Sequence, residues 1–178
     1  MSMRRRLPDS QSIVQVYAVI AVMFTGWTIT AFLWKLSAWL LLLNLGEIIA
    51  LFSYAMAANF LESLVILLML LGLCALLPSR FLRDDFIVRA TILAIGLLAA
   101  LMTFVSSLMR FGIDRGLLLL VAPLAVLLLM SFFLHRSSKY PRLRASALWV
   151  SDHVVVFLFI LIPLFAVASV YVIYRNIA

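Results

Sequence analysis

The segment between residues 36 and 77 most constrains the fold of this chain, because it is an almost unbroken apolar stretch. Its main interruptions are Asn44, Gly46, Glu47, Asn59 and Glu62. A helix needs about 20 apolar residues to cross a hydrocarbon core roughly 30 Å thick. The stretch is therefore too long for one membrane crossing and awkward as two, so the way it folds decides the topology.

The remainder of the chain is apolar enough to share the same environment. Hydrophobic residues make up 67% and charged residues only 12% of the 178 residues, whereas charged residues are about a quarter of an ordinary soluble domain. Only helices and closed barrels satisfy the backbone within lipid, and long Leu, Ile, Val and Ala runs without polar alternation indicate helices. We predict an all-α fold, a polytopic helical membrane bundle without a soluble domain.

Outside the long stretch, four crossings are easy to place, and they cover about residues 13–34, 89–108, 116–134 and 149–174. Pro123 and Pro163 lie within the last two. Proline removes a backbone donor and clashes with the preceding turn, so we expect kinks that neighbouring groups in the bundle tolerate.

Residues 1–12 form a short basic segment that contains Arg4, Arg5 and Arg6 and resembles the charged lead of a signal sequence. The apolar run that follows, 13–34, is 22 residues long and has no clear cleavage site after it. A typical signal core is shorter. We therefore expect a retained signal-anchor helix, with 13–178 forming a single transmembrane domain.

The distribution of Lys and Arg decides between five and six crossings. A split of the long stretch at Ala58 gives six crossings, and one crossing within it gives five. With five crossings and the N-terminus inside, ten of the fourteen basic residues are cytoplasmic, whereas six crossings place only six inside. Basic residues favour the cytoplasmic side. Five crossings are therefore favoured, with six as the alternative. With five crossings, we expect the chain in a plasma (inner) membrane, with the N-terminus cytoplasmic and the C-terminus outside.

Five crossings leave residues 35–58 without a span of their own. Asn44-Leu-Gly46 is typical of a turn, and Glu47 suits the first turn of a new helix. The first helix would then extend to about residue 43, and the second would cover 47–77 with its crossing at 59–77. Each would contain about 31 residues and measure roughly 46 Å. The surplus must tilt, lie in the outer interface, form a re-entrant hairpin or contact a partner.

Glu62 is the strongest candidate for a functional residue, because an intramembrane carboxylate is costly and usually faces a bundle interior or a water-filled cavity. Asn59 precedes it by three residues and shares its helix face. The two residues form a candidate intramembrane polar site, for a proton or a polar substrate. The alternative is a structural glutamate that fastens helices together.

A second candidate is an outer-interface polar cluster, whose members are Asn44, Glu47, Arg110, Asp114 and Arg115. With five crossings, all of them lie on the outer side. Because Glu47 and Arg110 both stand at the ends of apolar runs, each would benefit from an opposite charge. We consider an ion pair between them, or a loop whose charges simply face water.

The basic segment after the fourth crossing carries Arg136, Lys139, Arg142 and Arg144. Such residues attract anionic headgroups by about 1 kcal/mol each near a membrane. The alternative is that they only determine topology. The net charge of +7 does not predict nucleic-acid binding, because the basic residues gather at the ends of apolar runs.

No cofactor or metal is expected. His135 and His153 are the only histidines, and Cys74 is the only cysteine and lies in an apolar run. A metal or bis-histidine haem site needs more ligands, or histidines at matched depth. Established catalytic motifs are absent from the sequence as well.

The leading hypothesis is therefore a non-catalytic integral membrane component that binds lipid, including anionic lipid, and assembles with a protein partner or with further copies of itself. An alternative is a small oligomeric transporter or channel that uses Asn59 and Glu62. A second alternative is a membrane-embedded enzyme acting on lipids, for which Glu47 and Arg110 are the candidate polar residues.

Overall fold

The computed structural model describes residues 8–76, 85–111, 121, 123–126, 128–129, 132 and 141–177, with side chains to residue 108 in the second range. Within these ranges every regular element is helical. The basic cluster Arg4–Arg6, most of the predicted crossing 116–134, and the sequence candidates Asp114, Arg115, Arg136, Lys139 and the Arg110 side chain lie outside them.

The helices are α1 (Ser10–Leu42), α2 (Leu45–Leu76), α4 (Phe86–Phe111), α6 (Pro141–Val154), the short 3-10 turn η3 (Val155–Phe157) and α7 (Leu158–Ile177). In the described ranges, four segments are long and apolar enough to cross a membrane: α1, α2, most of α4, and the continuous segment from α6 to α7. The prediction of an all-α helical bundle is confirmed.

The long apolar stretch folds into two overlong helices joined by a tight turn, as the sequence predicts. Helices α1 and α2 contain 33 and 32 residues, which corresponds to about 50 and 48 Å at 1.5 Å per residue. Helix α2 continues without interruption through Ala58. The break that the alternative of six crossings requires at this residue is absent.

The turn between α1 and α2 is closed by a reciprocal pair of hydrogen bonds. The backbone N–H of Asn44 donates to Glu47 Oε2, and the backbone N–H of Glu47 donates to Asn44 Oδ1, each over 2.9 Å. This arrangement is a capping box, which satisfies two backbone donors that a helix start leaves without partners. Asn44 and Glu47 therefore begin α2, and Glu47 also meets the positive end of its dipole.

Helix α1 begins at Ser10, because Asp9 caps it. The hydroxyl and the backbone N–H of Ser12 both donate to the Asp9 carboxylate, as expected of an N-cap residue. These two hydrogen bonds hold the pKa of Asp9 below its usual 3.8. The helix starts slightly earlier than the predicted crossing 13–34.

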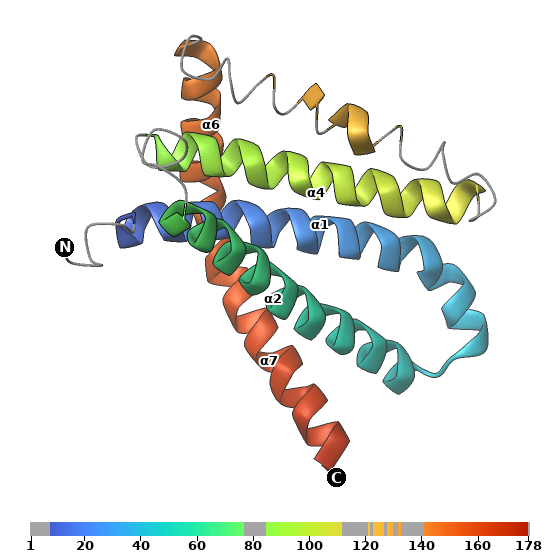
Figure 1. The fold of residues 1–178 in the computed structure, drawn as a ribbon. Coiled ribbons are helices and arrows are strands. Elements are labelled where there is room, and N and C mark those ends of the chain that lie inside the picture. The colour runs from blue at the N-terminus through green and yellow to red at the C-terminus, as the bar shows by residue number, and fades with distance from the viewer. Residues whose placement is uncertain are drawn as a thin grey trace.

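Helix α1 is the central element, and two separate hydrophobic clusters form on its flanks. One cluster joins α1 to α2 and α4 through Val16, Ile20 and Phe24 of α1. The other joins it to α2 and α7 through Ala18 and Ala21. Figure 1 shows α4 alongside α1, while α6 and α7 cross it at a steep angle. Of the four candidate spans, α1 has the largest buried share.

Polar contacts between distant parts of the sequence define the two ends of the bundle. At one end Arg144 of α6 forms an ion pair of 2.8 Å with Asp85, next to the start of α4, and Gln15 of α1 contacts Asp152 of α6 over 3.5 Å. Toward the other end the Tyr54 hydroxyl donates to Asn176 Oδ1 over 3.0 Å. The C-terminal end of α4 and the N-terminal end of α6 lie at different ends of the bundle (Figure 1), and the predicted crossing 116–134 lies mostly outside the described residues.

The segment 141–177 is one nearly continuous helix, interrupted where α6 meets α7. The backbone N–H of Leu158 donates to the carbonyls of both Val155 and Val156, which closes the 3-10 turn η3. Helix α7 continues through Pro163. The irregular turn thus lies upstream of the proline at which the sequence predicts a kink.

This arrangement predicts which residues react from the same side of a membrane. We replace Cys74 with Ala and introduce single exposed cysteines. Ser10→Cys and Ala145→Cys should react with an impermeant thiol reagent from one side of sealed, oriented vesicles. Leu45→Cys and Arg175→Cys should react only from the other side, because they lie at the opposite end of the bundle. Labelling of Ala145→Cys together with Arg175→Cys from one side would contradict the fold.

Candidate functional site

An interhelical hydrogen bond joins α1 to α2 midway along both helices. The Thr28 hydroxyl donates to Asn59 Oδ1 over 2.9 Å. Nearer the end of the bundle that holds Asp85, the Ser63 hydroxyl donates to the Phe60 carbonyl over 2.8 Å, and its oxygen lies 3.4 Å from the Tyr17 hydroxyl of α1. Hydrogen bonds of this kind hold transmembrane helices together where lipid provides no hydrophobic driving force.

Asn59 and Glu62 lie one turn apart on α2 but differ in exposure. Asn59 is only 3% exposed, and its Nδ2 has no hydrogen-bond partner among the described residues. Glu62 is exposed and forms no hydrogen bond or ion pair within the described ranges. Asn59 therefore faces α1, whereas Glu62, one turn further along α2, faces outward.

Both residues line a cavity of about 350 Å³ enclosed by α1, α2 and α4. The lining residues are Phe24, Trp27 and Thr28 from α1, Ala55, Ala58, Asn59 and Glu62 from α2, and Leu98, Leu101, Met102 and Val105 from α4. We call this space the α1–α2–α4 cavity. Thr28, Asn59 and Glu62 provide its polar side, and α4 provides an apolar wall.

The depth of the cavity follows from its position along the helices. Thr28, Asn59 and Leu98 all lie close to the middle of their helices, which span Ser10–Leu42, Leu45–Leu76 and Phe86–Phe111. In a bilayer centred on α4, its lining residues Leu98 to Val105 lie within the hydrocarbon region, between the midplane and the side of the α1–α2 turn, where a charged side chain costs up to about 2.5–3.5 kcal/mol on insertion scales. A carboxylate at this depth needs a compensating cation or proton.

The outer-interface cluster is only partly described. Glu47 already accepts the backbone N–H of Asn44 in the capping box, so its carboxylate has a structural role at the helix start. The Arg110 side chain, Asp114 and Arg115 lie outside the described residues, and the predicted pair between Glu47 and Arg110 stays a prediction. The capping pattern is readable in the sequence as Asn-x-x-Glu before an apolar run.

The basic residues expected to contact anionic lipid differ in their surroundings. Arg144 is engaged with Asp85, which reduces its availability to a headgroup, whereas Arg142 is exposed. Trp149 is exposed beside them and stacks on His153 with ring centroids 4.4 Å apart. Lipid contact at Arg136 and Lys139 lies outside the described residues.

Sequence reasoning missed the whole α1 side of the cavity, namely Phe24, Trp27 and Thr28, and its apolar α4 wall. All three belong to the apolar run that the sequence assigns to the first crossing, and nothing in that run marks Thr28 as the partner of Asn59. A usable signal is the presence of one hydrogen-bonding side chain near the middle of each of two consecutive crossings, because an antiparallel hairpin brings such residues to the same depth.

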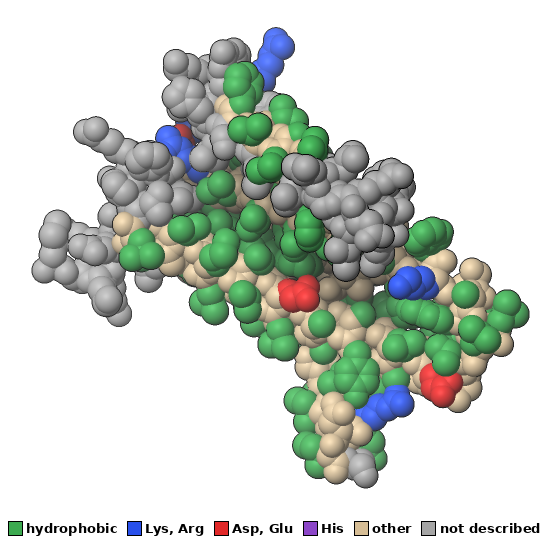
Figure 2. Space-filling view, turned by 45° about the vertical axis from the view of Figure 1, so that its right-hand side comes forward, with side chains coloured by type: hydrophobic (Ala, Val, Ile, Leu, Met, Phe, Trp, Pro, Cys, Tyr) green, Lys and Arg blue, Asp and Glu red, His purple; other side chains and the backbone are tan. Residues whose placement is uncertain are grey.

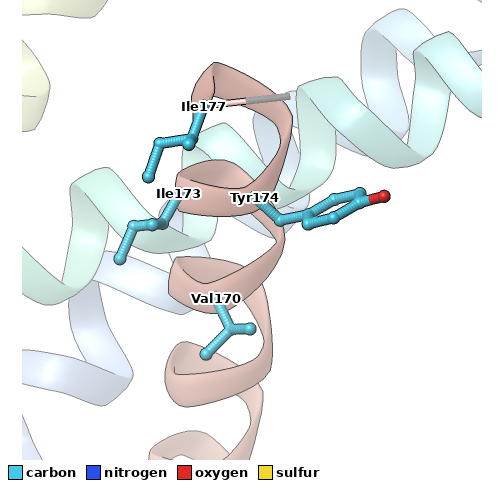
Figure 3. Close-up of a pocket in the computed structure, with 4 residues that line it drawn as sticks. All are labelled: Val170, Ile173, Tyr174 and Ile177. Atoms are coloured by element: carbon cyan, nitrogen blue, oxygen red, sulfur yellow. The ribbon is translucent and has the colours of Figure 1, made fainter.

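Two further cavities formed by described residues have an almost entirely apolar lining. One of about 390 Å³ lies between α4, α6 and part of 123–129. Another lies at the end of α7 along Val170, Ile173, Tyr174 and Ile177; in Figure 3 Ile173 and Ile177 point to one side of the helix and Tyr174 to the other. Neither offers a set of convergent polar groups.

In the described ranges, no group of three or more His, Cys, Asp and Glu side chains is placed to hold a metal ion. Comparison of the chain with protein families, with curated proteins and with solved structures finds no match. The α1–α2–α4 cavity therefore has to be interpreted from its own geometry.

The bond between Thr28 and Asn59 predicts a measurable coupling. In a double-mutant cycle with Thr28→Val and Asn59→Leu, we expect a coupling of about 0.6 kcal/mol, and at most about 1.7 kcal/mol, in unfolding from mixed micelles. The matched control is Thr30→Val, because the Thr30 hydroxyl bonds the Gly26 carbonyl within α1. A cycle of Thr30→Val with Asn59→Leu should give no coupling; equal values in both cycles would refute the pairing.

Proposed function

We propose that this protein is a non-catalytic integral membrane component that assembles with another membrane protein or with a second copy of itself. Its apolar helices are compatible with an integral membrane protein. The proposed orientation in a plasma (inner) membrane places the N-terminus and Arg144 on the cytoplasmic side, where Arg142 meets anionic lipid, and the α1–α2 turn outside.

The observation that carries the proposal is the exposed tip of the hairpin between α1 and α2. Its large apolar side chains are 59–86% exposed, and they are Leu33, Trp34, Leu40, Leu41, Leu42 and Leu45. We call these six residues the hairpin tip. They stand at the far end of helices about 50 Å long, in a membrane whose hydrocarbon core measures roughly 30 Å.

Helices that are this much longer than the hydrocarbon core is thick can be accommodated only at a cost in free energy. Tilting or thinning of the bilayer costs a fraction of a kcal/mol per Å of mismatch, and association with other helices is an alternative. Large exposed apolar patches usually mark interaction sites. The capping box fixes the start of α2, with two residues between it and the end of α1, which gives a partner a preformed turn at the tip.

The proposal predicts the size of the particle in mild detergent. Native mass spectrometry should detect an assembly larger than one 20.0 kDa chain with defined stoichiometry. The double variant Leu41→Ser, Leu42→Ser should dissociate it. The control Val167→Ser, Val170→Ser removes equally exposed apolar groups from α7 and should leave it intact. A partner-free wild-type monomer would contradict the proposal, as would equal effects of the two double variants.

A second candidate function is a small oligomeric transporter or channel. The observation that favours it is the α1–α2–α4 cavity, which combines Thr28, Asn59 and Glu62 near the middle of three helices. For the lipid-acting enzyme the described residues offer no comparable site, because Glu47 is engaged in a helix cap.

Flux measurements test the transporter. Reconstituted protein should carry monovalent cations or protons across the vesicle membrane. Glu62→Gln should reduce this flux at least tenfold, because it removes the only carboxylate among the described residues that lines the cavity. Asp152→Asn serves as the control, because Asp152 is an exposed carboxylate near the end of the bundle. Flux that is unchanged in Glu62→Gln would exclude a role for this residue in transport.

A further inference from the structure

We propose that the α1–α2–α4 cavity is a binding site for an organic cation with apolar substituents, which enters from the lipid. The inference is independent of partner assembly at the hairpin tip. It rests on the charge, the aromatic lining, the depth and the size of the cavity.

The charge of the cavity selects a cation. Glu62 is exposed at the cavity and has no cationic partner within the described ranges. An anion would meet repulsion from this carboxylate, and a neutral molecule would leave its charge uncompensated in a medium of low dielectric constant. Figure 2 shows charged side chains as isolated patches in a largely hydrophobic surface on the face drawn.

Two aromatic residues of α1 favour an organic cation. Phe24 is almost completely buried, whereas Trp27 is 37% exposed, and both line the cavity with Glu62. The face of an aromatic ring attracts ammonium and phosphonium groups, most strongly for tryptophan, and such rings are typical of sites for quaternary cations. The α4 wall, which includes Leu98 and Met102, suits apolar substituents on the same ligand.

The lining disfavours a bare divalent metal ion. Hard cations such as Ca²⁺ take six to eight oxygen ligands, whereas only Thr28, Asn59 and Glu62 offer side-chain oxygens here. Thr28 and Asn59 already bond each other. The Asn59 Nδ2 is buried without a partner among the described residues, and its partial positive charge would repel a metal ion.

Depth and size complete the description of the ligand. The cavity lies near the middle of three helices, so a headgroup anchored at the membrane surface does not reach it, whereas a lipophilic cation dissolves to this depth. Its volume of about 350 Å³ falls within the roughly 300–1,000 Å³ of sites for small organic ligands.

Binding to the full chain in lipid nanodiscs tests the inference. The probes are tetrapropylammonium and tetraphenylphosphonium, and tetraphenylborate is the anion matched in shape to the latter. Isothermal titration should give saturable binding of at least one of the two cations and none of the borate. Trp27→Leu should weaken binding severalfold. The control Trp149→Leu removes an exposed tryptophan of α6 that does not line the cavity and should leave binding unchanged.

The carboxylate is tested by two substitutions at one position. Glu62→Gln should lower the affinity for the cation at least tenfold, whereas Glu62→Asp retains the charge and should retain binding; helix content by circular dichroism shows that each variant is folded. No saturable binding of either cation, equal binding of tetraphenylborate, or unchanged affinity in Glu62→Gln would overturn the inference. Binding without flux would refute the transporter while leaving this site intact, and neither result bears on assembly at the hairpin tip.

Discussion

The structure depends on the burial of α1 on two flanks at once. The series Val16, Ile20 and Phe24 packs toward α2 and α4, while Ala18 and Ala21 pack toward α2 and α7. Small residues on the second flank let a steeply crossing helix approach closely, as is common in membranes. The other long helices are placed by their contact with this one, and the α1–α2–α4 cavity forms where the first flank ends at Phe24.

Polar groups within the bundle are arranged around the same helix. Thr28 and Tyr17 of α1 each bond a residue of α2, which fixes the register of the hairpin at two depths. Buried polar atoms need partners in lipid because water is absent. Only one end of the Asn59 amide has such a partner. Its Oδ1 accepts from Thr28, whereas its Nδ2 has no partner among the described residues. This half-satisfied amide and the outward carboxylate of Glu62 distinguish the cavity from the apolar ones.

Much of this architecture follows from local sequence chemistry. Apolar run length identifies α1, α2 and α4, and Asn44 with Glu47 defines the turn because a capping box involves only neighbouring residues. The site is less predictable. A spacing of three residues places Asn59 and Glu62 on one side of α2 but does not say which of them faces α1. The partner of Asn59 depends on the register between two helices, which packing at Phe24 and its neighbours decides. The irregular turn at Val155–Phe157 likewise reflects the junction of two helices, and Pro163 alone does not locate it.

The double burial of α1 also has a consequence for biogenesis. The flank of α1 that carries Ala18 and Ala21 is covered by α7, and Gln15 contacts Asp152, a residue 137 positions later in the sequence. During synthesis α1 and α2 can pair as soon as their turn has formed, and Met56 of α2 then covers part of this flank, but its contacts with α7 form only after the last helix has entered the membrane. Helix α1 is therefore only partly covered by other helices for most of the synthesis. Its native packing is complete only after α7 has inserted.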